Sequence, residues 1–277
     1  MTAKSQKTSI RKVSRLVVKL GTGVLSPTPG IIETDRLRVL GESVRKLRKE
    51  GVEVIIVSSG AVGLGMAKRG LAARPSDLSI LRACASIGQN LLMDVWREAP
   101  EPLGLIIAQM LLTREAFRSR SSSRNVELTL RRLLEHGAVP IVNENDSVSD
   151  EEIRFGDNDV LSALLASLCK AEMLAILSTA PGLMTSLEDG KIIPFVSDIT
   201  PAIEAMAKGT KSATAVGGMI TKIEAAKIAT MSGCAVFVGS GTKPDHLPLI
   251  LKGETTGTFF SPAGLGLDET KKWWRFF

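Results

Sequence analysis

Lys19 lies inside an apolar run, residues 16–20, and is followed by Gly21 and Gly23. A lysine within a buried strand needs an anionic partner or a route to solvent. Glycines after a strand let backbone N–H groups approach a phosphate or a carboxylate closely. The segment therefore predicts an anion site. The alternatives are an edge-strand lysine that points outward and a glycine-rich loop that is only a tight turn.

A second apolar run is followed by Ser59 and Gly60, and the densest polar cluster of the chain lies between residues 143 and 159. This cluster contains Asn143, Asn145, Asp146, Asp157, Asn158 and Asp159. Either Asp157 or Asn158 could cap the helix that starts beside them, but capping accounts for one side chain and not for the set. The order of residues does not fit a calcium-binding EF-hand loop.

A third segment, residues 216–222, brings two glycines and Lys222 to the start of the last long predicted helix. Glycines and a lysine at a helix N-terminus suit a second anion site, although an ordinary turn is the alternative. The phosphate-binding loop of P-loop enzymes, the third glycine of the dinucleotide fingerprint and the protein-kinase motifs are missing. With only His136 and His246, histidine-based nucleophilic catalysis is disfavoured.

These residues follow short apolar runs that alternate with amphipathic stretches, which indicates a mainly parallel sheet covered by helices. Strands buried on both faces are predicted over residues 16–20, 52–58, 105–111, 138–142, 173–178 and 235–238. Helices are predicted over residues 35–49, 78–97, 123–135, 159–169 and 221–231, with Gly51 and Gly137 at two helix C-termini. Ligands of such sheets bind outside the carboxyl ends of the strands, so the polar loops should share one crevice.

The chain has 277 residues, of which 44% are hydrophobic and 23% charged, so it is expected to fold. Its net charge of +6 arises partly from a basic N-terminus, and no nucleic-acid-binding motif accompanies it, so no nucleic-acid partner is expected. The three cysteines lack disulfide or metal-site spacing. Neither a secretory signal nor a membrane span is expected, and the predicted location is the cytoplasm.

One main domain is expected over residues 15–262, between a basic extension at 1–14 and a tail at 263–277. Residues 183–211 differ from the rest in being charged, with a turn predicted at 188–190 and a short helix after Pro201. This segment is either a lid on the nucleotide side or an ordinary surface insertion.

Five segments together resemble the glutamate 5-kinase family of amino acid kinases. They are residues 17–23, 57–62, 142–146, 155–163 and 217–222, in order between about Arg15 and Pro262. Asn-Glu-Asn-Asp at 143–146 and Phe-Gly-Asp-Asn-Asp at 155–159 distinguish this branch from other amino acid kinases. The resemblance implies an α/β fold, a three-layer αβα sandwich with a mainly parallel central sheet. It also implies ATP-dependent phosphorylation of the γ-carboxylate of L-glutamate, the first step of proline biosynthesis.

The resemblance also implies roles for individual residues. Lys19 and Lys222 would stabilise charge on the transferring phosphoryl group, and Asp159 would hold both lysines. Ser59, Asp146 and Asn158 would bind glutamate, with Gly60, Asn143 and Asp157 as further candidates. ATP, with Mg²⁺ bridging its phosphates, would lie over Lys19, Gly21, Ser178, Thr179, Val216, Gly217, Gly218, Met219, Ile220, Thr221 and Lys222. No metal site of the protein's own is expected. L-proline is a candidate feedback inhibitor, and a homo-oligomer is expected because this fold commonly associates.

Three features depart from the family pattern. Ser178-Thr179 stands where members usually have Thr-Asp, and Ala215-Val216 precedes the two glycines where they have Gly-Thr. The chain ends at Phe277, so we expect it to lack the RNA-binding-like PUA domain common in bacterial members. Two alternatives therefore remain. One is a relative with another acidic substrate or phosphoryl donor, and the other is a non-catalytic regulator that binds glutamate or proline.

Overall fold

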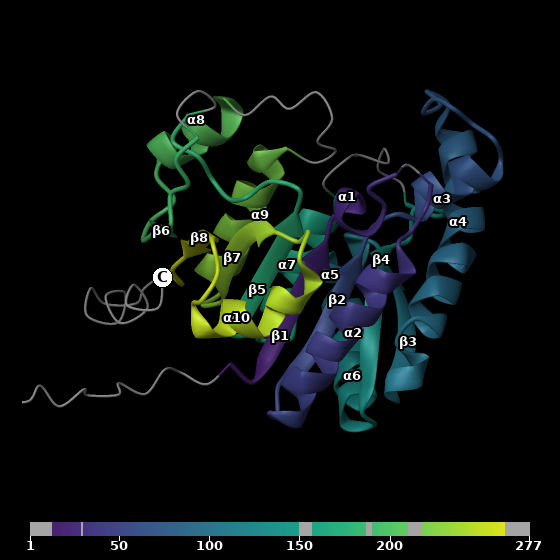
Figure 1. The fold of residues 1–277 in the computed structure, drawn as a ribbon, viewed down its shortest axis with the longest axis horizontal. Coiled ribbons are helices and arrows are strands. Elements are labelled where there is room, and N and C mark those ends of the chain that lie inside the picture. The colour runs from purple at the N-terminus through teal and green to yellow at the C-terminus, as the bar shows by residue number, and fades with distance from the viewer. Residues whose placement is uncertain (1–12, 29, 150–156, 187–189, 210–217, 264–277) are drawn as a thin grey trace, which may run out of the picture.

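The computed structural model describes residues 13–28, 30–149, 157–186, 190–209 and 218–263. Its strands form one sheet in the order β3-β4-β2-β1-β5-β7-β8-β6 (Figure 1). The strands are β1 (Arg15–Leu20), β2 (Glu53–Ser58), β3 (Ile106–Leu112), β4 (Ala138–Glu144), β5 (Met173–Ser178), β6 (Phe195–Val196), β7 (Ala235–Ser240) and β8 (Gly257–Phe260). Among the described residues, all pairings between these strands are parallel except that of β7 with β8, which confirms the predicted mainly parallel sheet.

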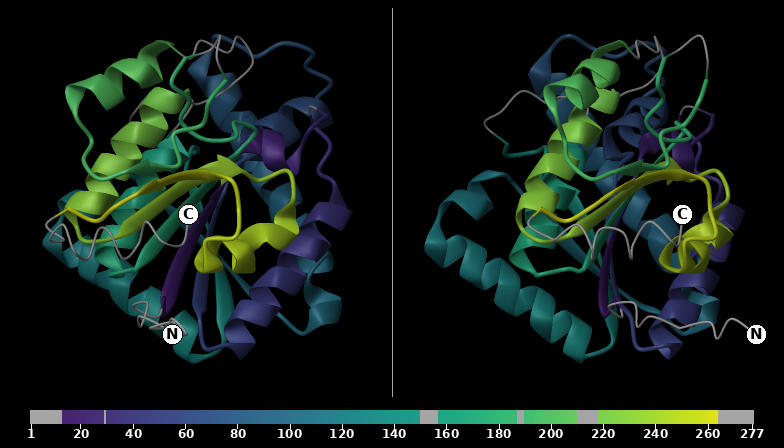
Figure 2. Two further views of the ribbon diagram at one scale, coloured as in Figure 1. Left: turned by 60° about the vertical axis from the view of Figure 1, so that its left-hand side comes forward. Right: turned by 90° about the vertical axis from the view of Figure 1, so that its left-hand side faces the viewer.

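Helices cover both faces of this sheet, as the rotated views show for α2 and α6 (Figure 2). The helices are α1 (Thr22–Leu25), α2 (Thr34–Lys49), α3 (Ala61–Lys68), α4 (Leu78–Glu98), α5 (Glu115–Arg118), α6 (Arg120–Glu135), α7 (Asp157–Leu168), α8 (Pro201–Gly209), α9 (Met219–Met231) and α10 (Leu247–Lys252), with 3₁₀ turns at Glu101–Leu103 and Pro244–His246. One apolar core joins the sheet to α1, α2, α4 and α10. A second core joins its other face to α6, α7 and α9, so the three-layer αβα sandwich is confirmed.

The alternation of side chains along β1 decides which core each residue enters. Leu16, Val18 and Leu20 belong to the core under α2, whereas Val17 belongs to the core under α7 and α9. Because side chains on a strand point to opposite faces in turn, Lys19 lies on the same face as Val17. The lysine is thereby directed toward the two helices that carry Asp159 and Lys222.

The predicted strands and long helices are present with shifted ends, and Gly51 and Gly137 have the positive φ typical of a residue just past a helix C-terminus. The prediction for 105–111 was wrong in one respect. This segment forms β3 at the sheet edge, where no strand of the described residues pairs with its outer side, and Ile106 is 61% exposed. An apolar run does not by itself distinguish an edge strand from a central one.

The unusual segment after residue 183 returns to the main sheet. Its short strand β6 pairs with β8, and its predicted helix after Pro201 is confirmed as α8. Neither β6 nor β8 was predicted, because two-residue and four-residue strands carry almost no periodic signal. Residues 188 and 189 of the predicted turn lie outside the described residues.

Helices α3 and α4 pack with their backbones in direct contact. A Cβ on Gly88 of α4 would lie 1.7 Å from the carbonyl oxygen of Ala61, and a Cβ on Gly65 of α3 would lie 1.9 Å from that of Cys84. Only glycine permits this approach. The contact links α4 to the first turn of α3, which begins next to Ser59 and Gly60.

We expect Gly88→Ala to destabilise the protein by about 1–3 kcal/mol, because the helices must separate to admit the methyl group. Gly63→Ala is the matched control, since a Cβ at this position of the same helix pair meets nothing within 4 Å. That control should be neutral or stabilising by up to about 1 kcal/mol, given the helix propensity of alanine. Urea unfolding of both variants measures the difference, and equal midpoints would contradict the prediction.

The three cysteines are free and buried. No helix of the described chain combines the length and the apolar character that crossing a bilayer requires.

Candidate active site

Lys19, Asp159 and Lys222 meet in one buried cluster at the carboxyl end of β1. Nζ of Lys19 lies 2.6 Å from Oδ1 of Asp159, and Nζ of Lys222 lies 3.2 Å from Oδ2. Asp159 is fully buried, and the two lysines are only 4% and 3% exposed. β1 pairs with β2 and β5, so the interpretation of Lys19 as an outward-pointing edge lysine is wrong. One carboxylate thus faces two ammonium groups, which leaves the cluster with a net positive charge.

Three elements position this cluster. Lys19 comes from β1, Asp159 from the first turn of α7, and Lys222 from the first turns of α9. The hydroxyl of Thr221 lies 2.8 Å from Oδ2 of Asp159 and 2.9 Å from the carbonyl oxygen of Gly218, so it can donate to either. Helices α7 and α9 pack side by side over the same core, which keeps the carboxylate beside the second lysine.

The ionisation of the cluster depends on its burial and on its three charges, which are the two lysine ammonium groups and the carboxylate of Asp159. Burial by itself would raise the pKa of Asp159, but the adjacent Lys19 and Lys222 outweigh it, so this pKa is lowered. Burial lowers the pKa of Lys222, and Asp159 offsets part of that effect. A buried cation is stable here only while its carboxylate partner remains ionised.

A chain of side-chain amides lies beside the charged cluster. Nδ2 of Asn158 donates to Oδ1 of Asn143 at 2.8 Å and to Oγ of Ser59 at 2.9 Å. The backbone N–H of Glu144 donates to Oδ1 of Asn143 at 3.0 Å and to Oδ1 of Asn158 at 3.3 Å. With its oxygen already accepting from Asn158, the Ser59 hydroxyl keeps its hydrogen to donate to a ligand. Asn158 serves this network, which argues against the alternative that it only caps α7.

The predicted glutamate-side residues occupy different depths. Asn143 is 2% exposed and lies beneath Asn158, so it is placed to orient other side chains. Gly60 has φ +120°, and a Cβ there would meet nothing within 4 Å, so its backbone conformation rather than crowding requires glycine. Asp157 begins α7, and its side chain lies outside the described part of the chain.

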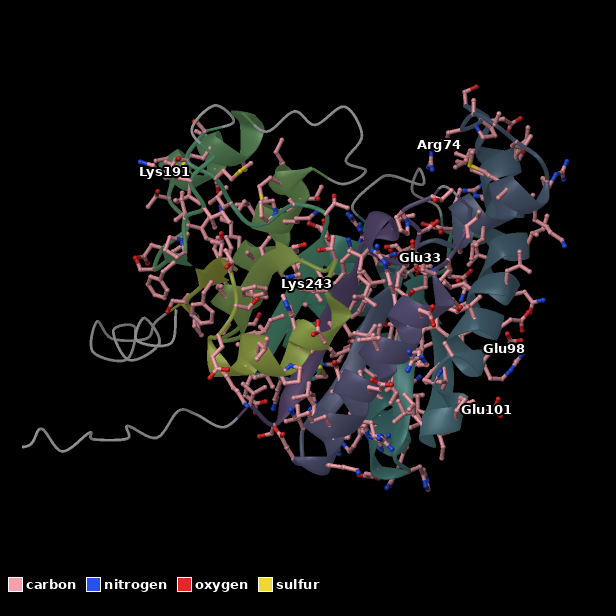
Figure 3. All side chains as sticks on the ribbon, viewed as in Figure 1. Glu33, Arg74, Glu98, Glu101, Lys191 and Lys243 are labelled. Carbon is pink, nitrogen blue, oxygen red and sulfur yellow. The ribbon has the colours of Figure 1, made fainter. Side chains whose placement is uncertain are left out.

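Asp146 lies on the loop after β4 and interacts electrostatically with Arg74. Arg74 comes from the loop between α3 and α4 (Figure 3). Burial lowers the pKa of Arg74, and the Asp146 carboxylate offsets part of this effect. The carboxylate therefore lies at the same end of the sheet as Ser59 and Asn158, where a ligand ammonium group could pair with it.

The residues predicted to contact ATP line the neighbouring strand ends. A Cβ on Gly21 would lie 3.8 Å from Nζ of Lys19, so the backbone passes close to this ammonium group. The N–H of Gly21 donates to the carbonyl of Leu177, and is therefore used by the fold rather than by a ligand. Thr179 is exposed and lies close to Gly23, because a Cβ on that glycine would be 2.9 Å from its methyl group.

The remaining residues predicted on the nucleotide side lie in different environments. Ser178 is 9% exposed, and its hydroxyl accepts from the N–H of Ala180 at 3.1 Å, so it stabilises its own turn. Gly218 precedes α9, whose first backbone N–H groups lack partners within the helix and suit a phosphate. Met219 is buried in the core and Ile220 is 51% exposed. Val216 and Gly217 lie outside the described residues.

Gln89 of α4 belongs to this site but was not predicted from the sequence. It is 9% exposed, and its Oε1 accepts from Nδ2 of Asn143 at 2.8 Å. The available signal was a glutamine on the apolar face of an amphipathic helix, between Ala85 and Leu92. A buried polar side chain usually has a hydrogen-bonding task.

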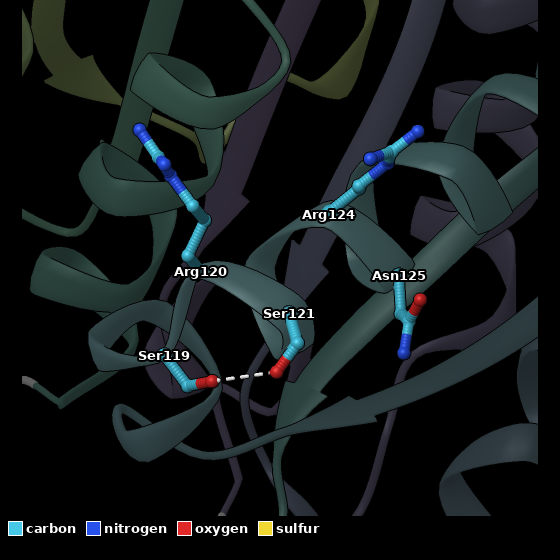
Figure 4. A pocket seen from close by; sticks show the side chains of 5 residues that line it. All are labelled: Ser119, Arg120, Ser121, Arg124 and Asn125. Atoms are coloured by element: carbon cyan, nitrogen blue, oxygen red, sulfur yellow. Dashed lines mark hydrogen bonds between the residues drawn. The ribbon is translucent and has the colours of Figure 1, made fainter.

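A separate polar hollow of about 540 Å³ lies at the N-terminus of α6 (Figure 4). It is lined by Ser119, Arg120, Ser121, Arg124 and Asn125, and the hydroxyls of Ser119 and Ser121 lie 2.9 Å apart. None of the residues predicted from the sequence lines this hollow. The candidate active site is therefore the buried charged cluster with the amide chain beside it.

Comparison with known proteins assigns this arrangement to a family. Residues 14–240 match the amino acid kinase family. Glutamate 5-kinase from Moorella thermoacetica is 41% identical over 99% of this chain and 73% of its own length. The chain belongs to the glutamate 5-kinase branch of the amino acid kinase family. Glutamate 5-kinase from Clostridium acetobutylicum is 39% identical and is matched over 96% of its length, so a member of similar length exists.

Solved structures agree with the family at the level of the fold. Carbamate kinase from Giardia lamblia bound to AMP-PNP superposes with a TM-score of 0.63 at 14% identity, over 90% of this chain and 99% of its own. A second structure of Giardia carbamate kinase gives a TM-score of 0.64 at 15% identity. These structures bear on the fold alone, whereas the matches to curated glutamate 5-kinases do not favour the regulatory alternative considered from the sequence.

The described residues do not form a metal site built from protein ligands alone. Within the described ranges, no group of three His, Cys, Asp or Glu side chains could hold a metal ion. Both oxygens of Asp159 already face lysines. Magnesium binds proteins through one or two carboxylates together with substrate phosphates and water, so a site of this kind suits a magnesium ion that arrives with the nucleotide.

Proposed function

We propose that this protein transfers the γ-phosphoryl group of ATP to the γ-carboxylate of L-glutamate, giving L-glutamyl 5-phosphate for proline biosynthesis. The observation that carries the proposal is the buried arrangement in which Asp159 holds Lys19 and Lys222 together beside Ser59 and Asn158. Phosphoryl transfer asks a protein mainly for positioning and charge stabilisation. Two lysines with one shared carboxylate provide both.

The roles of the residues follow from their charges and hydrogen-bonding capacity. Lys19 and Lys222 neutralise negative charge as it develops on the transferring phosphoryl oxygens, and Asp159 fixes the separation of the two ammonium groups. The first turn of α9 receives a phosphate through backbone N–H groups that have no partner within the helix. A carboxylate nucleophile is already ionised at neutral pH, so the site needs no general base. When bound with ATP, Mg²⁺ adds neutralisation of the phosphate charge.

On the glutamate side, Ser59 presents a hydroxyl donor to a substrate carboxylate, Asn158 lies beside the substrate and orients that hydroxyl by donating to its oxygen, and Asp146 pairs with the substrate ammonium. The match to curated glutamate 5-kinases supports this substrate over other acids. Gly60 leaves the entrance beside Ser59 free of a side chain.

The direct test incubates the purified protein with MgATP, L-glutamate and hydroxylamine. Hydroxylamine traps the acyl phosphate as γ-glutamyl hydroxamate, while ADP reports ATP consumption. Glutamate-dependent formation of both products in equal amounts is expected. ATP turnover that does not depend on glutamate, or hydroxamate formed equally well from aspartate, would refute the assignment.

We expect Asp146→Asn to raise KM for glutamate by about 10- to 100-fold, because a charge-assisted hydrogen bond to the substrate ammonium is lost. The KM for MgATP should change less than twofold. Glutarate, which lacks the α-amino group, is the control substrate, and the variant and the wild type should phosphorylate it with equal efficiency. An unchanged KM for glutamate would remove Asp146 from ammonium recognition.

We further propose that the enzyme works in the cytoplasm as a homo-oligomer and responds to L-proline. The sequence comparisons support these statements only through the family to which the chain belongs. Light scattering of the purified chain and glutamate-dependent rates measured with added proline test the oligomeric state and the inhibition.

A further inference from the structure

Helix α4 presents three polar side chains to residues 143–149, a segment that comprises the end of β4 and the loop after it. Arg82, Ser86 and Gln89 lie on one helical face, because they are spaced by four and three residues. Nη2 of Arg82 donates to the carbonyl oxygen of Ser149 at 2.6 Å, and the hydroxyls of Ser86 and Ser147 lie 2.7 Å apart. Gln89 reaches Asn143 at the other end of the same segment. These contacts span the loop that carries Asp146.

Gln89 occupies the most buried of the three positions. It is 9% exposed, and its Nε2 has no hydrogen-bond partner among the described residues, whereas its Oε1 accepts from Asn143. Burying a side-chain amide costs free energy unless its polar atoms form hydrogen bonds. The hydrogen bond that Gln89 forms in the described chain holds the NH₂ group of Asn143.

The orientation of the Asn143 amide then decides the orientation of the next amide. With its NH₂ group held by Gln89, Asn143 turns its Oδ1 toward Nδ2 of Asn158 at 2.8 Å. Asn158 donates in turn to Oγ of Ser59 at 2.9 Å. A reversed Asn143 amide would place two NH₂ groups against each other, which is repulsive. Gln89 and the backbone N–H of Glu144, which donates to Oδ1 of both asparagines, therefore together set the donor and acceptor directions outward to Ser59.

We propose that Gln89 is a positioning residue for the acceptor substrate, an inference that rests on the proposed function. Through Asn143 and Asn158 it keeps the hydroxyl hydrogen of Ser59 directed at the substrate carboxylate. Gln89 itself lies beneath the site and does not touch the lysines that act on the phosphoryl group. Its loss therefore weakens glutamate binding and leaves nucleotide binding intact.

The kinetic test compares three variants of the full chain. Gln89→Met keeps the volume and removes the acceptor, Gln89→Glu keeps an acceptor oxygen, and Ser86→Ala alters the same helix face outside the amide chain. We expect Gln89→Met to raise KM for glutamate about tenfold, the equivalent of about 1.4 kcal/mol, with KM for MgATP and kcat within twofold. The glutamate KM of Gln89→Glu should lie closer to the wild-type value than that of Gln89→Met does. The glutamate KM of Ser86→Ala should equal the wild-type value. An unchanged glutamate KM in Gln89→Met, or equal rises in both KM values, would overturn the proposal.

A second measurement needs no substrate and separates this inference from the proposed function. The side-chain NH₂ resonances of Asn143 and Asn158, assigned by their disappearance in Asn143→Ala and Asn158→Ala, are recorded in the free protein. Gln89→Met should shift both resonances, although Asn158 does not contact Gln89. An Asn158 resonance that does not shift in Gln89→Met would show that Gln89 does not influence the orientation of the Asn158 amide. An inactive wild type with shifted resonances would refute only the proposed substrate.

Discussion

Asp159→Asn is expected to reduce kcat at least about 10³-fold and to lower the free energy of unfolding by about 3–5 kcal/mol. The variant keeps the shape of the side chain and removes its charge. Lys19 and Lys222 then remain as two buried ammonium groups, 4% and 3% exposed, with no carboxylate between them. Removing one partner of a buried ion pair is strongly destabilising because the remaining charge is uncompensated.

The catalytic loss has the same origin. In the wild type, the ammonium groups sit 2.6 Å and 3.2 Å from the two oxygens of one carboxylate, which sets their separation before ATP binds. Without that tether, each lysine relaxes away from the other or gives up its proton. Preorganised charge is the main contribution of a protein to phosphoryl transfer, so the rate falls steeply.

The pH dependence provides an independent check of this prediction. The pKa of Asp159 is lowered in the folded protein, so its stabilising effect is present above the unfolded value of about 3.9 and is lost as the pH falls below it. The difference in unfolding free energy between wild type and Asp159→Asn should therefore shrink in acid. Urea unfolding at pH 7 and at pH 3 measures it.

Glu204→Gln is the matched control for removal of a carboxylate. Glu204 pairs with Lys227 at 2.8 Å, but both side chains are exposed, so the change should cost less than about 1 kcal/mol and leave kcat unaltered. An Asp159→Asn variant that keeps wild-type activity or stability would contradict the assignment of Asp159 as the tether.

Lys222→Met is expected to lower kcat at least about 10²-fold while KM for glutamate stays within about twofold. Methionine fills a similar volume, so the core around α9 is preserved and the charge alone is lost. A group that acts on charge developing in the transition state affects kcat rather than substrate binding. Steady-state kinetics with each substrate varied in turn measures this separation.

The pH profile of the wild type tests the same role. Burial lowers the pKa of Lys222 from the ordinary value of 10.5, with Asp159 offsetting part of the effect, so kcat should decline with rising pH before an ordinary lysine would lose its proton. Far-UV circular dichroism and the urea midpoint serve as controls for folding. A folded Lys222→Met variant with unchanged turnover would exclude Lys222 from the mechanism.

Local sequence signals were sufficient for the α/β class and for the position of the polar loops. Continuous apolar runs identify the central strands, since burial on both faces leaves little room for polar residues. The glycines after Lys19 and the amide-rich segment around Asn143 stood at strand ends, where ligands bind. These features depend on neighbours in the chain, and so they can be read directly from it.

Three features could not be derived from local sequence signals, and the first of them, the pairing of Asp159 with both lysines, was expected only through the family resemblance. Asp159 binds two lysines that the chain brings from a different strand and a different helix, and Gln89 reaches Asn143 across the space between α4 and β4. The antiparallel strand β8 is too short to leave a pattern. Hydrophobic periodicity and composition indicate which face of a helix or strand is buried. The partner that a side chain meets on that face depends on how elements distant in the sequence pack together. The sequence therefore determined which residues could do chemistry, and the tertiary structure decided which of them act together.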